Sequence, residues 1–158
     1  GARIVVSDLI FAQNEAIAQQ TPHRLVIDTA GESYYLQRRR VTGDWPVEGD
    51  ADFKLSLNWR VGGVDNLVDF TTDERFAGVT IAPVTGAAGS YTIDAAADDA
   101  GLITVEFDEL GSPTWAAGVD GVIRPQAIGL RGDSGGFVVT IAPFTGRITV
   151  ERATVVNE

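Results

Sequence analysis

The sequence predicts an α+β domain with one N-terminal helix followed by an antiparallel β domain. An uninterrupted amphipathic stretch occupies residues 3–20. From residue 23 onward, short runs rich in Val, Ile and Thr alternate with turns that contain glycine. Helical and strand patterns do not alternate, which argues against a Rossmann-like parallel sheet. We expect one domain over 1–158, with the helix at about 3–20 and the β domain at about 23–155.

The helical stretch reads RIVVSDLIFAQNEAIAQQ. Apolar residues recur at helical spacing and define a stripe expected to pack on the domain's own sheet: Val6, Leu9, Ile10, Ala16 and Ile17, with Val5 and Ala12 beside it. Pro22 disfavours a helical conformation at Thr21, so the helix should end there. Arg3 is preceded by none of the usual capping residues, so we expect the helix to continue upstream.

Several segments are predicted strands. HRLVID (23–28) and SYYLQRRR (33–40) flank the short TAGE turn and form an expected hairpin. The other candidates are ADFKLSLNWRV (51–61), GVTIA (78–82), SYTIDA (90–95), LITVEF (102–107), GVIRPQAIGL (121–130), GFVVTIA (136–142) and RITVERA (147–153).

One internal repeat is present. Residues 79–86 read VTIAPVTG and residues 139–146 read VTIAPFTG, so only the sixth position differs. Proline presets the first residue of a turn and glycine accepts a left-handed conformation. We therefore expect two similar hairpin turns rather than a duplicated domain.

The composition excludes several classes of function. The formal net charge is −10 and the sequence pI is about 4.4, which opposes nucleic-acid binding and adsorption to anionic lipid. Cysteine is absent, so the chain holds no disulfide, thiolate nucleophile or cysteine-based zinc site. Methionine is absent as well, and no apolar run approaches the ~20 residues that span a bilayer. We expect no cofactor and no metal.

The segment RGDSGG (131–136) contains the letters that surround the nucleophile of trypsin-like proteases. A catalytic Ser134 would need a histidine base, and the only histidine is His23, in the unrelated context QTPHRLVID. Phe137 also replaces the proline that follows the motif in those proteases. A glycine-rich turn is the favoured interpretation of this segment, ahead of a serine hydrolase or an RGD adhesion tag.

Other candidate sites have simpler explanations. Lys54 lies on the polar side of its predicted strand. The acidic stretch DAAADDAG (94–101) lacks EF-hand spacing, so an exposed loop is favoured over a calcium site. The RRR cluster (38–40) suits a solvated strand edge. Of the tryptophans, Trp59 is expected in the core, and Trp45 and Trp115 in loops with partial packing.

Three segments, in order, resemble minor pseudopilins of the GspH/FimT class. SDLIFAQNEAIAQQTPHRLVID resembles the part of those proteins that follows the membrane helix. VEFDELGSPT resembles an FxxxGxPT element, and VVTIAPFTGRITVER resembles the last strand–turn–strand hairpin. The matching residues are Leu9, Ala12, Glu15, Ala16 and Ile17 in the helix, Phe107, Gly111, Pro113 and Thr114 in the second segment, and Gly146 and Arg147 in the third. Residues 40–100 carry no usable match.

The resemblance implies a pilin-like fold, in which the helix packs on an antiparallel β domain of two sheets. It also implies a structural subunit of the type II secretion pseudopilus rather than an enzyme. The partners would be other pseudopilins, secretion-system proteins and the prepilin peptidase. A single membrane helix upstream would anchor the chain in the bacterial inner membrane, with this domain in the periplasm.

The helix is the expected contact with neighbouring subunits. Its amino-terminal part supplies the candidate interface residues Ile4, Val5, Val6, Leu9, Ile10 and Phe11, and we expect Ile4, Val5 and Phe11 to stay free of the domain's own sheet. Two alternatives stay open. One is a minor type IV pilin, including one that acts in DNA uptake, although the negative charge opposes DNA binding. The other is a secreted serine hydrolase that uses Ser134.

Overall fold

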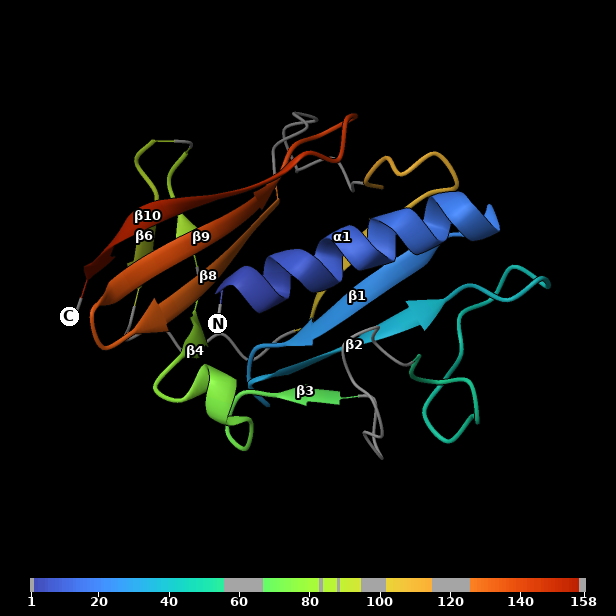
Figure 1. Ribbon diagram of the computed structural model, residues 1–158, viewed down its shortest axis with the longest axis horizontal. Coiled ribbons are helices and arrows are strands. Elements are labelled where there is room, and N and C mark those ends of the chain that lie inside the picture. The colour runs from blue at the N-terminus through green and yellow to red at the C-terminus, as the bar shows by residue number, and fades with distance from the viewer. Residues whose placement is uncertain are drawn as a thin grey trace.

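The computed structural model describes residues 2–55, 67–82, 84–87, 89–94, 102–114 and 126–156. Its elements, in chain order, are α1 (Ala2–Gln19), β1 (His23–Asp28), β2 (Ser33–Arg38), β3 (Leu67–Asp69), the 3₁₀ helix η1 (Glu74–Phe76), β4 (Thr80–Ala82), β5 (Val84–Thr85), β6 (Thr92–Asp94), β7 (Leu102–Phe107), β8 (Gln126–Gly132), β9 (Gly135–Ile141) and β10 (Ile148–Val156). The α+β class is confirmed, and Figure 1 shows α1 lying across the strands of both sheets.

Helix α1 ends where the sequence predicts, and its last turn closes in a Schellman motif. The amide of Thr21 donates to the carbonyl of Ala16 at 3.1 Å, and the amide of Gln20 donates to that of Ile17 at 3.3 Å. Gln20 takes the left-handed conformation that this motif requires, with φ 49°. The two bonds pair carbonyls that a helix end otherwise leaves to solvent.

The described strands form two sheets. The four-stranded sheet has the order β3-β2-β1-β7, and the six-stranded sheet has the order β4-β8-β9-β10-β6-β5. All pairs are antiparallel except β10 with β6. The predicted antiparallel β domain therefore contains one parallel pair. Strand β10 pairs first with β9, through Ile148–Ala153, and then with β6, through Thr154–Val156.

Most predicted strands are present, and β1 and β7 have the predicted bounds. The predicted strand at 51–61 is wrong over its described part. Residues 51–54 form turns and bends, and Leu55 makes a single bridge to Leu36. The carbonyl of Phe53 accepts a hydrogen bond from the Gln37 side chain at 3.1 Å. Contacts with β2 therefore hold this segment as a loop, despite its alternating pattern.

The first copy of the repeat also differs from the prediction. Val84–Thr85 forms β5, which pairs with β6, whereas the second copy turns the chain from β9 to β10. Pairing with β6 determines the conformation of Val84–Thr85 in the first copy. Two nearly identical sequences therefore take different structures in this chain.

The main core lies between α1 and the two sheets. Its largest fully buried side chains include Tyr34, Phe76, Phe107, Leu9, Leu25, Ile27, Leu36, Ile128 and Ile141. A smaller cluster, built from Ala82, Tyr91, Ile93 and Val138, packs on the other face of the six-stranded sheet. Both faces of that sheet are thus partly covered, which explains the near-continuous apolar runs in β8 and β9.

The buried face of α1 is rotated from the predicted stripe. Val5, Leu9, Ala12 and Ala16 are at most 1% exposed, whereas Ile10 and Ile17 are 42% and 47% exposed. The small side chains of the two alanines let the helix backbone approach the sheets closely. Apolar periodicity alone could not determine this rotation, because isoleucines flank the alanine face.

A buried hydrogen bond also sets the rotation of α1. Asp8 is fully buried, and its Oδ2 accepts from the Tyr34 hydroxyl of β2 at 2.6 Å. The sequence alone did not indicate a role for Asp8. A carboxylate buried in the helix–sheet contact requires polar partners, so the Asp8–Tyr34 bond favours one rotation of α1 over its neighbours.

Replacing Tyr34 with Phe is expected to lower the free energy of unfolding by about 1–3 kcal/mol, because the buried carboxylate loses this donor. Tyr35→Phe, on the half-buried next position of β2, is the matched control and should cost less than about 0.5 kcal/mol. Urea unfolding followed by circular dichroism measures both. Equal losses would contradict a specific role for the Asp8–Tyr34 bond.

The only histidine is a core residue. His23 is fully buried at the start of β1, and its Nδ1 donates to the carbonyl of Thr21 at 2.8 Å. Its Nε2 is buried without a hydrogen-bond partner among the described residues. Burial lowers the pKa of His23, against the smaller opposing effects of the Thr21 carbonyl and Glu15.

This arrangement predicts a pH dependence of stability. Because the folded-state pKa lies below the ordinary value of about 6.5, the unfolded state takes up its proton first as the pH falls. Stability should be level above about pH 7 and decline as the pH falls through about 6.5. Urea midpoints between pH 7.5 and 5.5 test this, and His23→Gln should abolish the slope. A variant that kept the slope would assign it to another group.

Candidate assembly surface

The segment RGDSGG is a tight hairpin between β8 and β9. Gly132 pairs with Gly135, so Asp133 and Ser134 form the two-residue turn. Only Gly135 of its glycines has a positive φ, at 134°. Gly136 is required for a different reason: a Cβ there would lie 2.6 Å from Ile93 Cδ1. The prediction of a turn is confirmed, and close packing explains a glycine that turn geometry does not.

The structure does not bring Ser134 and His23 together. Ser134 is exposed at the end of the β8–β9 hairpin, in the six-stranded sheet. His23 is fully buried in the four-stranded sheet, with Nδ1 engaged by the Thr21 carbonyl. A histidine so placed cannot accept a proton from this serine.

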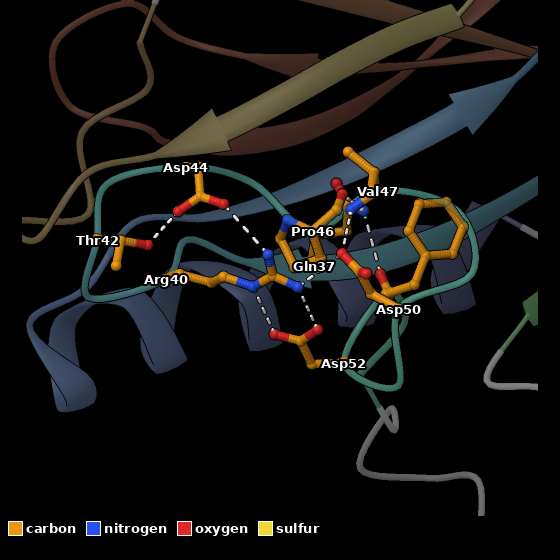
Figure 2. A network of polar contacts seen from close by, with 9 residues as sticks. Gln37, Arg40, Thr42, Asp44, Pro46, Val47, Asp50 and Asp52 are labelled. Atoms are coloured by element: carbon orange, nitrogen blue, oxygen red, sulfur yellow. Dashed lines mark hydrogen bonds and ion pairs between the residues drawn. The ribbon is translucent and has the colours of Figure 1, made fainter.

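The arginine cluster is more ordered than a solvated edge. Figure 2 shows the Arg40 guanidinium surrounded by three carboxylates. Its Nη2 lies 2.6 Å from Asp50 Oδ2 and 2.8 Å from Asp52 Oδ1, and its Nη1 lies 3.1 Å from Asp44 Oδ2. These contacts raise the pKa of Arg40. Arg40 lowers the pKa of Asp52, and it adds to the effect of the Thr42 hydroxyl on the pKa of Asp44 and of the Val47 amide on that of Asp50. Arg40 therefore holds together the loop that follows β2, and the carboxylates of that loop occupy its guanidinium group.

The same loop is attached to β2 by the buried side chain of Gln37. Its Nε2 donates to the carbonyls of Pro46 and Phe53, and its Oε1 accepts from Arg24 Nε at 2.8 Å. The Arg24 guanidinium also lies 4.1 Å from the centre of the Trp45 ring. Trp45 thus has the partial packing role expected from the sequence, whereas Trp59 and Trp115 lie outside the described residues.

The remaining predicted sites have simple outcomes. Lys54 lies on the aromatic rings of Tyr35 and Phe53, at 5.5 and 5.8 Å from their centres. Of the acidic stretch 94–101, the structure describes only the backbone of Asp94, in β6. The described residues include no cluster of three or more acidic, histidine or cysteine side chains suited to a metal ion.

The predicted interface residues of α1 divide into three groups. Val5 and Leu9 are buried in the domain's own core. Ile4, Val6 and Phe11 are half-buried and pack against that core, so the expectation that Ile4, Val5 and Phe11 stay free of the domain is wrong. Ile10 is the one predicted interface residue that is largely exposed. Of the described residues, none forms a helix both long and apolar enough to cross a membrane.

The turns that contain Gly111 and Gly146 are hydrogen-bonded to the side of α1. Gln13 Nε2 donates to the carbonyl of Gly111 at 2.8 Å and to that of Gly146 at 3.2 Å. Both glycines have positive φ, and an added Cβ would collide with Ile17 at Gly111 and with Gln13 at Gly146. Both belong to segments that carry the resemblance stated above, so Gln13 joins two of those segments to the third. The sequence did not single out Gln13.

No protein-family profile and no curated protein sequence matches this chain. Two solved structures of the minor pseudopilin EpsH, from the type II secretion system of Vibrio cholerae, superpose on it. One is 12% identical, with a TM-score of 0.56, and the match covers 96% of this chain and 93% of that one. The other is 13% identical, with the same TM-score, and covers 96% and 90%. The fold is that of a minor pseudopilin.

The match to these pseudopilin structures covers 96% of the chain, so it includes most of residues 40–100, where the sequence carries no usable resemblance. The implied arrangement of one N-terminal helix packed on a β domain of two sheets is confirmed. In this pseudopilin fold the outward face of α1 carries Arg3, Ser7, Ile10, Asn14, Ile17 and Ala18. These residues are exposed, and this face is the candidate assembly surface.

Arg40→Ala is expected to release the loop while changing global stability little, because exposed ion pairs contribute weakly to folding. Hydrogen exchange should speed up at the amides of Gly43, Val47 and Phe53, which the ordered loop protects. In the parent chain the same amides should keep their protection down to about pH 4 and lose it below that, since the carboxylate pKa values are lowered in the folded state. Exposed Arg152→Ala serves as the control. Unchanged exchange in Arg40→Ala would show that Gln37 holds the loop by itself.

Proposed function

We propose that this chain is a minor pseudopilin, a non-catalytic subunit that assembles into the pseudopilus of a type II secretion system. The observation that supports this most strongly is the pseudopilin fold across 96% of the chain. The helix segment, the FxxxGxPT-like turn and the final hairpin support it independently, because they resemble pseudopilins in sequence and meet at Gln13 in space.

The geometry agrees with assembly through the helix. Val5, Leu9, Ala12 and Ala16 hold α1 on its own sheets, so they are not available to a neighbour. The contact surface we propose therefore centres on Ile10, with Val6 and Phe11 at its two margins and Ile17 further along the helix. Exposed isoleucines on a helix face suit burial against a second helix.

The partners and the location follow from the same proposal. The partners are other pseudopilins and the secretion-system proteins that assemble them, and a prepilin peptidase processes the precursor. The chain is held in the bacterial inner membrane by a helix upstream of α1, with this domain in the periplasm. The buried His23 and the exposed Ser134 are consistent with a structural subunit.

Deletion of the gene in the source bacterium should abolish or strongly reduce the release of folded exoproteins into the medium, and the full-length gene should restore it. Ile10→Glu is expected to fail in this complementation, because it places a charge in the helix contact. The domain should still fold, since Ile10 is 42% exposed. Circular dichroism of the purified variant checks the fold.

Val47→Glu is the matched control, because Val47 is also an exposed apolar residue, at 64%, but lies in the loop after β2. It should complement fully. Normal secretion in the deletion strain would overturn the proposed function, above all if pili or DNA uptake were lost instead. Full activity of Ile10→Glu would instead remove Ile10 from the assembly surface.

A further inference from the structure

The β9–β10 turn presents an exposed aromatic side chain. Phe144 is 71% exposed, and its φ of 66° is in the left-handed region that a bulky residue rarely adopts. The Gln13 side chain donates a hydrogen bond to the Gly146 carbonyl, which attaches the turn that carries Phe144 to α1. Exposed Arg147 follows on the same turn. We call Phe144 and Arg147 the knob.

The internal repeat distinguishes Phe144 from its counterpart in the first copy. Phe144 occupies the single position at which VTIAPVTG and VTIAPFTG differ. In the first copy this position is Val84, which is half-buried and packs on the smaller core cluster. The second copy thus carries a large apolar side chain that contributes little to its own core, in a conformation that costs energy. Such strain is retained where the surrounding structure enforces it, and it is common at functional contacts.

A hollow lies at the opposite end of β9. It has a volume of about 540 Å³ and is formed by the β3–β4 connection and the β8–β9 hairpin. Phe70 and Val79 contribute its apolar lining, and Glu74 and Asp133 supply negative charge at its rim. Glu32 and Asp73 also line it, with Asp73 already paired to Arg75, and Arg131 is the only basic residue of the lining. The hollow is therefore part apolar and predominantly acidic.

The knob and the hollow complement each other in shape and charge. The knob offers an aromatic ring beside a cation, and the hollow offers an apolar lining beside carboxylates. They cannot meet within one molecule, because β9 separates them by roughly 20 Å. Two copies that each carry a charge of −10 repel each other, so a contact that sets Arg147 against carboxylates is favoured over most others. Figure 1 shows the β8–β9 and β9–β10 turns at opposite ends of β9.

We propose that the knob of one copy docks in the hollow of a second copy. This contact is heterologous, so it joins copies head to tail, in a ring or an open filament, instead of closing into a symmetric two-fold dimer. The proposal rests on the proposed function, because a filament subunit needs contacts along the filament. The knob–hollow contact adds a β-domain contact to the helix contact proposed above. A single aromatic anchor makes the isolated contact weak.

Because the chain contains no cysteine, engineered single cysteines can trap a weak contact. Thr145→Cys marks the knob and Ala77→Cys marks the hollow, and both positions are exposed. The two variants, one with a mass tag, are mixed in equal amounts and oxidised. We expect nearly all of the disulfide dimers to be mixed, against the half that random pairing of equal amounts gives. Thr145→Cys mixed with Val47→Cys is the control and should give the random share.

A second set of variants separates docking from folding. Phe144→Gly, added to Thr145→Cys, should reduce the mixed dimers to the random share, while the unfolding midpoint stays the same or rises because glycine accepts the left-handed conformation. Arg147→Glu on the knob variant should reduce the mixed dimers, and so should Glu74→Arg on the hollow variant. Mixing the two reversed partners should restore them. Random pairing of the two marked variants, or an excess of knob–knob dimers, would overturn the proposal.

The same variants separate this proposal from the proposed function. If Phe144→Gly supports secretion and the marked variants pair at random, the head-to-tail contact is wrong, whereas the pseudopilin assignment stands. If the gene is dispensable for secretion but the mixed dimers form in excess, the contact is correct and the proposed function is wrong.

Discussion

The close approach of α1 to the two sheets is the constraint on which the rest of the molecule depends. Val5, Leu9, Ala12 and Ala16 are removed from solvent by this contact, and the removal of apolar surface from water is the main favourable term in folding. The helix contacts β1 and β7 of one sheet and β9 and β10 of the other. Without α1, the apolar faces of both sheets would be open.

One polar interaction makes this contact specific. The apolar residues of α1 cover more than one face, so burial alone would accept more than one rotation of the helix. Asp8 removes that freedom, because its buried carboxylate must meet the Tyr34 hydroxyl. Once the rotation is set, Gln13 necessarily faces the turns that contain Gly111 and Gly146. Ile10 and Ile17 are then exposed. The assembly surface on α1 and the support that Gln13 gives to the β9–β10 turn both depend on this one rotation.

Polar side chains order the irregular parts of the chain in a similar way. The loop after β2 has little apolar content of its own, and Arg40 and Gln37 hold it through carboxylates and backbone carbonyls. The network around Arg40 is exposed, so its effect is on the local order of the loop more than on global stability. In a chain with a net charge of −10, Arg40 thus pairs with carboxylates of its own loop.

The sequence by itself determined the elements whose causes are local. The end of α1 follows from Pro22, the β1–β2 hairpin from its apolar pattern and short turn, and the RGDSGG turn from its glycines. The resemblance of three short segments was enough to predict the pilin-like fold, although about 60 residues between them carried no match. Residues 51–55 show the limit of this reasoning, because their alternating pattern predicts a strand that contacts with β2 do not allow.

Only the tertiary structure decided which face of α1 is buried. Leu9 and Ile10 are adjacent and equally apolar, yet one is fully buried and the other is 42% exposed. The choice depends on Asp8 meeting Tyr34, a partner 26 positions away. The tertiary structure also brought Gln13 to Gly146, 133 positions away, and joined the β3–β4 connection to the β8–β9 hairpin in the acidic hollow. Periodicity in a sequence reports that a helix has an apolar side, whereas the direction of that side depends on partners that are distant along the chain.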